Sequence, residues 1–305
     1  LNPWSKWQGG NLSQQVSLYL SLSDSAIAKG AKLIVWPESA LPVYLLAGNY
    51  PSSEQRIHEF VDSRRIHLLT GMPDAVFYFD KTKAPEDAKK VTNSETVYST
   101  YNSILLFKPN TLQVQRYGKI MLVPFGERVP FIDTFPFLGD WIKWNVGITS
   151  WNVGKEKKVF TLNDSTKIGG VICIESIYPD FVSEFVKKGA ELLAVVTNDS
   201  WYGYSSGPFQ HKEISVLRAV ENRRSVLRAA NGGISCIIDP TGKTAAATGL
   251  FTKEILVGEA GIYDKLTFYT SYPFIIPLLV TIISVGMILI FFSNKYFFKR
   301  IKLEE

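Results

Sequence analysis

An uninterrupted apolar stretch near the C-terminus constrains this chain more than any other feature. No charged residue occurs over residues 266–294, and residues 274–292 are almost entirely apolar. A helix of this length spans roughly 30 Å of hydrocarbon, which is enough to cross a bilayer. Pro273 and Pro277 fall where a first turn or a mild kink tolerates proline. The alternative is a helix buried in a protein core. We expect a transmembrane helix over residues 266–294.

Basic residues follow this stretch and predict its orientation. Lysine or arginine occupies positions 295, 299, 300 and 302, whereas Lys265 alone directly precedes the stretch. Cytoplasmic ends of transmembrane helices carry an excess of such residues. Residues 295–305 are therefore expected to form a basic cytoplasmic tail, with the body of the chain on the outer side of the membrane.

The composition excludes several classes of protein. Of the 305 residues 46% are apolar and 20% charged, which is typical of a folded domain. The net charge of +5 has no dense basic cluster, so we expect no nucleic-acid partner. Two cysteines exclude a disulfide-rich scaffold, and the three histidines lack ligand spacing, so we expect no metal.

The chain opens Leu1-Asn2-Pro3-Trp4, which predicts an internal cut in a longer protein.

Short apolar strands alternate with helices through the rest of the chain. Strands that are apolar on both faces and interleaved with helices are typical of a layered α/β domain. Residues 108–111 predict a hairpin turn, and the charged segment 81–90 predicts a solvent loop. The expected strands cover residues 32–36, 68–71, 103–107, 112–117, 167–173, 192–197, 226–229 and 235–238, and the expected helices cover residues 12–28, 54–63, 179–188 and 209–221.

Three segments each place one reactive side chain at or after the end of an expected strand. They are Glu38, Lys119 and Cys173. A carboxylate can take a thiol proton, a thiolate can attack a carbonyl, and a cation can stabilise the oxyanion that forms. The fold, rather than adjacency in sequence, assembles such sets. The sequence therefore predicts these three residues as a catalytic triad for covalent acyl transfer.

Each of these residues also has a simpler interpretation. A free cysteine packs like a small hydrophobic residue, an acid at the position of Glu38 can cap a helix, and a lysine usually lies at the surface. Two glycines before Cys173 and polar residues after it favour the nucleophile. Cys236 lies inside the apolar run 234–238, and we expect it to be structural.

Several motifs now resemble a known family. Trp36-Pro37-Glu38, Tyr117-Gly118-Lys119 with the following Val-Pro-Phe-Gly-Glu, and Cys173-Ile-Glu-Ser resemble the three signature regions of the nitrilase superfamily. Asn198-Asp-Ser-Trp-Tyr-Gly, Gly207-Pro-Phe-Gln-His, Arg218-Ala-Val-Glu-Asn and Arg228-Ala-Ala-Asn-Gly-Gly resemble its apolipoprotein N-acyltransferase branch. The resemblance covers about residues 4–258 and continues into the apolar stretch. It implies an αββα sandwich over residues 1–265 that starts after the domain's first strand.

The resemblance also implies roles for individual residues. Glu38 is implied to be the general base, Lys119 the transition-state stabiliser and Cys173 the nucleophile. Glu127 matches a second essential acid that orients the lysine. Because Lys119 is a cation near the thiol, we expect it to favour the thiolate.

Two supporting residues and two departures complete the comparison. Glu175 and Trp201 match residues implicated in shaping the acyl-accepting site. The position after the nucleophile is often aromatic in this branch but is Ile174 here. The branch also has several membrane helices before the catalytic domain, and this sequence lacks them.

The implied function is transfer of a fatty acyl chain from a phospholipid, through a cysteine thioester, to the α-amino group of a diacylglyceryl apolipoprotein. No cofactor is implied, and we expect a monomer in the bacterial inner membrane with a periplasmic catalytic domain. Residues 41–50 and 131–151 are candidates for a membrane-facing rim, or pack within the domain. One rival hypothesis is a membrane-anchored amidase that hydrolyses a C–N bond. Another is a catalytically silent binding domain.

Overall fold

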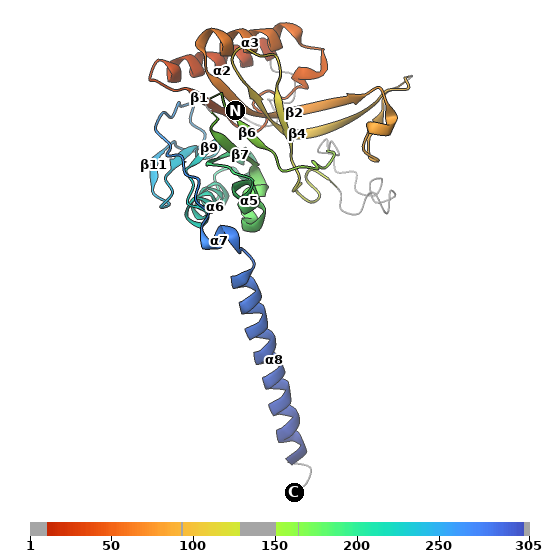
Figure 1. Ribbon diagram of the computed structural model, residues 1–305, viewed down its shortest axis with the longest axis vertical. Coiled ribbons are helices and arrows are strands. Elements are labelled where there is room, and N and C mark those ends of the chain that lie inside the picture. Colours follow the sequence, from red (N-terminus) through yellow and green to blue (C-terminus); the bar gives the residue numbers. More distant parts are fainter. Residues whose placement is uncertain (1–10, 93, 129–150, 164, 302–305) are drawn as a thin grey trace.

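Two facing β-sheets lie between two pairs of helices in the computed structural model of this protein, which describes residues 11–92, 94–128, 151–163 and 165–301 (Figure 1). Helices α2 (Leu12–Ile27) and α3 (Pro51–Arg64) cover the first sheet. Helices α5 (Pro179–Lys187) and α6 (Gly207–Asn222) cover the second. The predicted αββα sandwich is therefore confirmed.

The first sheet has the strand order β1-β2-β4-β3, with β5 also paired to β4, within the described residues. Strand β1 runs parallel to β2, and the other pairs are antiparallel. The strands are β1 (Leu33–Trp36), β2 (His67–Tyr78), β3 (Lys89–Lys90), β4 (Val97–Phe107) and β5 (Gln115–Gly118).

The second sheet has the order β11-β10-β9-β8-β7-β6. Its centre is parallel, because β7, α5, β8, α6 and β9 form two consecutive βαβ units. The strands are β6 (Val159–Thr161), β7 (Lys167–Ile172), β8 (Leu192–Asn198), β9 (Val226–Asn231), β10 (Cys236–Ile238) and β11 (Thr244–Ala247).

Strand alternation explains why the sheets stack in this way. In β4, Ile104 and Leu106 face the second sheet, whereas Leu105 and Phe107 pack in the cluster that contains α2 and α3. Successive side chains of a strand point to opposite faces, so an apolar run buries both faces at once. At Gly170 a Cβ atom would lie 2.8 Å from Ile104, so glycine lets β7 approach the first sheet.

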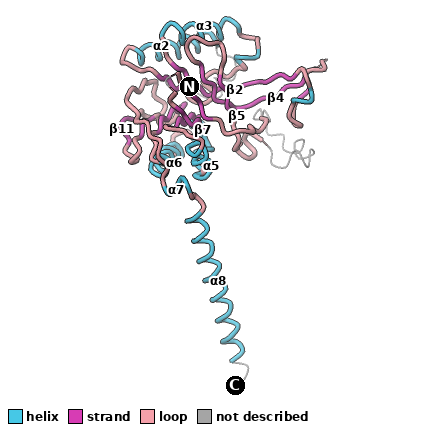
Figure 2. The backbone as a smooth tube through the Cα atoms, viewed as in Figure 1, coloured by secondary structure: helices cyan, strands magenta, loops and turns pink. Residues whose placement is uncertain are grey.

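The expected strands and the observed ones differ most in β2 and β4. These strands form a long hairpin that projects from the sandwich (Figure 2) and extends well past the expected segments 68–71 and 103–107. The tip holds the expected loop 81–90, which contains a short 3-10 helix, η2 (Lys81–Lys83), and β3. The predicted truncation of the first strand concerns residues outside those described.

The C-terminal segment forms two helices. Helix α7 (Phe268–Ser271) packs against α5 and α6, and α8 (Ile275–Ile301) extends away from the sandwich (Figure 1). Among the described residues one helical stretch, Ile275–Asn294, is long and apolar enough to cross a membrane, and it is not buried in the protein.

Hydrogen bonds fasten α7 to the sandwich. Thr267 Oγ1 donates to the Glu221 carbonyl at 2.6 Å, and Thr270 Oγ1 donates to Asn222 Oδ1 at 3.0 Å. The buried Arg224 donates from Nη1 to the Lys265 carbonyl at 2.9 Å. These bonds join the end of α6 to the segment just before the apolar helix.

Candidate active site

The ends of four strands carry the side chains of the site. Glu38 follows β1, Lys119 follows β5, Cys173 follows β7 and Asp199 follows β8. Ligand sites in α/β sheets commonly lie outside the carboxyl ends of strands, because the chain leaves the sheet there and its side chains converge. The fold thus brings the three predicted catalytic residues to one place.

Glu38 is buried and held from both sheets. Its Oε2 atom accepts a hydrogen bond from the Asn198 backbone N–H at 2.8 Å, and Oε1 accepts one from Asn102 Nδ2 at 2.6 Å. Gly71 of β2 lies directly against its backbone, since a Cβ atom there would be 2.6 Å from the Glu38 Cα. Two donors and close packing therefore fix the carboxylate.

Lys119 is 1% exposed and lies between two carboxylates. Its Nζ atom is 2.9 Å from Glu127 Oε1 and 3.5 Å from Glu38 Oε1, and Asn102 Nδ2 also donates to Glu127 at 2.9 Å. Burial by itself lowers the pKa of Lys119, but Glu38, Glu127 and Cys173 outweigh it and the pKa is raised. The ammonium group therefore stays charged and is suited to stabilising an anion.

Cys173 stands at a strained turn between β7 and a short 3-10 helix, η3 (Cys173–Ile177). Its φ angle of 49° lies in the left-handed region that non-glycine residues rarely adopt. Burial raises the pKa of its thiol to about 12 and Glu38 adds to this, whereas Lys119 and a hydrogen bond with Thr197 lower it. Lys119 acts in the expected direction, but the net shift favours the thiol. The sulfur therefore needs a base to take its proton as it reacts.

The three supporting residues lie in different environments. Glu127 contacts Lys119, as described, and its Oε2 accepts the Val123 N–H at 2.8 Å. Trp201, in the 3-10 helix η4 (Asp199–Tyr202), is 54% exposed. Glu175 is completely buried in η3.

The contacts of Glu175 tie the segments that carry Lys119 and Cys173 to each other. Its Oε1 accepts hydrogen bonds from Tyr117 Oη and the Ile120 N–H, both at 2.7 Å, and Oε2 accepts one from the Ile172 N–H at 2.8 Å. Burial raises the pKa of Glu175 to about 7. A role in shaping an acyl-accepting site stays a prediction.

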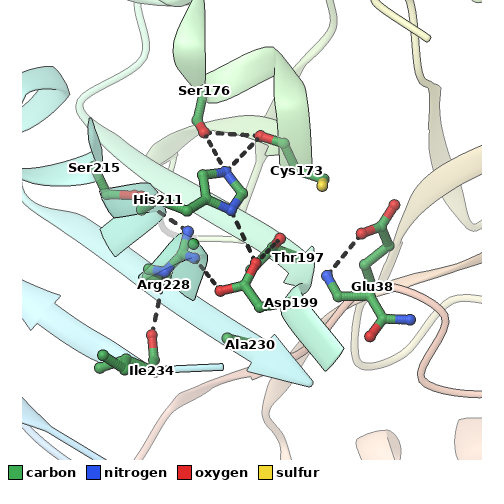
Figure 3. A network of polar contacts seen from close by, with 12 residues as sticks. Glu38, Cys173, Ser176, Thr197, Asp199, His211, Ser215, Arg228, Ala230 and Ile234 are labelled. Carbon is green, nitrogen blue, oxygen red and sulfur yellow. Dashed lines mark hydrogen bonds and ion pairs between the residues drawn. The ribbon is translucent and has the colours of Figure 1, made fainter. Parts of the chain in front are cut away.

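Sequence reasoning missed several residues of the site. Asn102 donates to two of its carboxylates, and the only signal was a polar residue within a strand. The buried set Thr197, Asp199, His211 and Arg228 lies behind Cys173 (Figure 3). The family motifs contain Asp199, His211 and Arg228, but the motifs by themselves assign none of them a role in the site. His211 shows no metal-ligand spacing with the other histidines, and no local pattern in the sequence links it to Asp199.

The rim and metal expectations concern the surroundings of the site. Leu41 and Leu45 are fully buried in the cluster beneath α2 and α3, so these side chains pack within the domain. Residues 131–150 of the second rim segment lie outside those described, and Trp151 packs edge-on against Tyr44. No group of three or more His, Cys, Asp or Glu residues in the described part of the chain is arranged to hold a metal ion.

Comparisons with known proteins agree with this architecture. The carbon-nitrogen hydrolase family model matches residues 5–261. Among solved structures, an amidase from Nesterenkonia sp. has a TM-score of 0.53 at 17% identity over 86% of this chain and 87% of its own. Saccharomyces cerevisiae Nit3, a member of branch 10 of the nitrilase superfamily, has a TM-score of 0.57 at 16% identity over 79% of this chain and 82% of its own. These likenesses show the shared fold.

Curated relatives are more similar in sequence. Apolipoprotein N-acyltransferase of Chlorobaculum tepidum is 38% identical over 91% of this chain and 52% of the relative. The protein of the same name from Geobacter metallireducens is 35% identical over 88% of this chain and 47% of the relative. The chain thus spans about half the length of the curated relatives it matches. With the family model covering most of its residues, the chain belongs to the carbon-nitrogen hydrolase family.

Proposed function

We propose that this protein is an apolipoprotein N-acyltransferase in which Cys173 carries the acyl group. The observation that carries the proposal is the union of two features in one chain. A buried Glu38–Lys119 pair adjoins a cysteine at a strained strand end, and an unburied apolar helix is fastened to the same sandwich. The first supports thiol-based acyl transfer, and the second supports substrates that are lipids. The named relatives point the same way.

The first half-reaction forms a thioester. Glu38 accepts the thiol proton as the Cys173 sulfur attacks the ester carbonyl of a phospholipid, which matches a thiol whose pKa is raised to about 12. Lys119 stabilises the oxyanion of the tetrahedral intermediate, a type of interaction worth about 3 kcal/mol per donor. The ester C–O bond then breaks, and Glu38 returns the proton to the departing lysophospholipid oxygen.

The second half-reaction forms the amide. The neutral α-amino group of the lipidated N-terminal cysteine of the apolipoprotein attacks the thioester carbonyl, and its proton passes to Glu38. The C–S bond breaks, and the sulfur recovers a proton. Glu127 holds Lys119 in position and Asn102 holds Glu38, because Glu127 contacts the lysine, Asn102 donates to the Glu38 carboxylate, and Asn102 also donates to Glu127. The scheme is ping-pong and uses a phospholipid donor and a diacylglyceryl apolipoprotein acceptor.

The proposed arrangement in the cell follows from the apolar helix and the basic residues after it. Residues 1–265 form the catalytic domain on the periplasmic side of the bacterial inner membrane, residues 266–294 hold the span, and residues 295–305 are cytoplasmic. Labelling single cysteines placed in the tail and in an exposed loop of the sandwich, from outside intact spheroplasts, tests this. If the tail is labelled and the sandwich is not, the protein has the opposite orientation in the membrane.

Mass spectrometry tests the chemistry. The protein expressed from its complete reading frame is incubated with phospholipid, and the acyl mass is expected on the peptide that contains Cys173. Cys236→Ala is the matched control, because Cys236 is the second cysteine of the chain and is buried within β10, not at a strand end that carries a triad residue. In cells that depend on the protein, Cys173→Ala should cause diacylated lipoprotein with a free amine to accumulate.

Three results would contradict the proposal. An acyl adduct on Cys236 in place of Cys173 would overturn the nucleophile assignment. Unchanged lipoprotein N-acylation in the Cys173→Ala strain would overturn the function. Rapid release of ammonia from simple amides, without acyl transfer to an amine, would favour the alternative of a membrane-anchored amidase.

A further inference from the structure

A buried polar network lies directly behind Cys173, and the reaction just described does not use it. Its centre is His211 of α6, whose ring lies between Asp199 and the first residues of η3 (Figure 3). His211 is 5% exposed and Asp199 is fully buried. A buried polar group without a hydrogen-bond partner is energetically costly. The donors and acceptors of this network therefore show which groups it holds in place.

The two nitrogens of the His211 ring face different partners. Nδ1 is 2.9 Å from Asp199 Oδ1, and Nε2 is 3.2 Å from the Cys173 carbonyl oxygen and 3.0 Å from Ser176 Oγ. Ser176 Oγ donates to the same carbonyl at 2.8 Å, so its lone pairs are left for the ring. A carboxylate and a carbonyl can only accept. Each ring nitrogen of His211 therefore faces a group that can accept a hydrogen bond from it.

Asp199 is in turn held as a carboxylate. Arg228 Nη2 donates to its Oδ2 at 2.6 Å, and both side chains are 0% exposed. Thr197 Oγ1 donates to its Oδ1 at 2.9 Å. Burial by itself raises the pKa of Asp199, but His211 and Arg228 outweigh it and the pKa is lowered. The negative charge of Asp199 beside the His211 ring is therefore kept at neutral pH.

The contacts run from Asp199 through His211 to the backbone carbonyl of Cys173. Cys173 has a φ angle of 49°, and residues in this region persist only where their surroundings determine the conformation. Its carbonyl oxygen lies within hydrogen-bond distance of His211 and Ser176. Figure 3 shows the sulfur on the other side of the residue, toward Glu38.

We propose that Asp199 and His211 form a positioning pair, which clamps the Cys173 carbonyl and so holds the strained turn that directs the sulfur toward Glu38. Neither residue exchanges a proton with substrate in this role. The inference rests on the proposed nucleophilic role of Cys173. It implies that a donor at the position of Nε2, rather than an imidazole as such, is what the nucleophile requires.

Two substitutions of similar size distinguish the effect of the hydrogen-bond donor from the effect of the side-chain volume. His211→Gln retains an N–H group that can reach the Cys173 carbonyl, and His211→Met has none. The rate of acyl-adduct formation on Cys173 is measured by rapid quench and mass spectrometry, with phospholipid as donor, and thermal unfolding is measured in parallel. We expect His211→Met to react about 10- to 100-fold more slowly than His211→Gln, because small displacements of a nucleophile are costly. The KM for phospholipid should be unchanged.

His58→Met is the matched control. His58 is 6% exposed and packs edge-on against Phe107 on the helix side of the first sheet, so the variant removes an equally buried imidazole away from the site. It should form the adduct at the wild-type rate. A slowing in His58→Met that equals the slowing in His211→Met would reduce the effect to general loss of stability and overturn the inference.

The remaining outcomes are also decisive. Equal rates for His211→Met and His211→Gln would overturn the positioning role while leaving Cys173 as nucleophile. If His211→Met does not fold, the test rests on His211→Gln. A folded His211→Gln protein that forms the acyl adduct at a rate within about fivefold of wild type supports the positioning role, and a larger loss of rate overturns it. A wild-type protein that forms no adduct on Cys173 overturns the proposed function, and the positioning role with it.

Discussion

Adding a single methyl group at Gly71 tests whether the position of Glu38 is set by backbone packing. In Gly71→Ala the new Cβ atom would lie 2.6 Å from the Glu38 Cα and 3.0 Å from both the Glu38 nitrogen and the Pro37 carbonyl oxygen. Carbon atoms in contact prefer about 3.5–4.0 Å, so the two backbone segments must separate by about 1 Å. All three contacts are backbone atoms, which no change of rotamer can relieve.

Such a shift acts on the two hydrogen bonds of the Glu38 carboxylate. These are 2.6 Å from Asn102 and 2.8 Å from Asn198, and a movement of 1 Å breaks both. Misplacement of a reacting group by this distance costs roughly 100-fold in rate. Overpacking itself costs about 1–3 kcal/mol of the free energy of unfolding. The loss of rate should therefore exceed what the loss of folded protein explains.

The assay is the rate of acyl-adduct formation on Cys173 per folded molecule, with thermal unfolding followed separately. Gly286→Ala is the matched control, since nothing lies within 4 Å of the position where its Cβ would be. This control should react at the wild-type rate. Should Gly71→Ala form the adduct as fast as the control, close packing against Glu38 would not be what positions the base.

Three further predictions follow from the site. Alkylation of Cys173 by iodoacetamide should accelerate about tenfold per pH unit from pH 7 towards 11, because the thiol pKa is raised to about 12; a plateau below pH 8 would show a resting thiolate. Asn102→Leu removes the donor shared by Glu38 and Glu127 and should cost about 2–3 kcal/mol in the free energy of unfolding, measured by denaturant titration, whereas a neutral result would argue against the bridge. Cys236→Ala should lower stability by about 1–2 kcal/mol while leaving the acylation rate unchanged, and a large loss of rate would argue for a role in the reaction.

The fold class could be predicted because buried strands carry a local signal. Runs that are apolar on both faces, separated by helical patterns, identify a stacked α/β arrangement without any knowledge of pairing. Each triad residue lies at or just after the end of such a run, so the convergence of Glu38, Lys119 and Cys173 could also be anticipated. The full length of β2 could not be predicted from the sequence. It continues through Gly71 and Pro73, which as single residues are typical of turns.

The environment of the triad was beyond a local pattern. His211 lies on α6, Asp199 follows β8 and Arg228 lies on β9, and only the finished fold brings them to Cys173. The sign of the thiol pKa shift also depended on the fold. The sequence offers a cation and a carboxylate with opposite effects on the sulfur, and their balance is set by distance and burial.

The attachment of α7 to the sandwich couples the direction of α8 to the orientation of the sandwich. Helix α8 has 27 residues and is therefore about 40 Å long. Three residues join it to α7, which Thr267 and Thr270 fasten to the sandwich, and the backbones of Tyr272 and Phe274 among them are hydrogen-bonded. A transmembrane helix adjusts its tilt to the thickness of the bilayer. In the proposed membrane arrangement a change in the tilt of α8 would be passed through this short junction to the sandwich, so lipid composition would influence the angle between the site and the membrane surface.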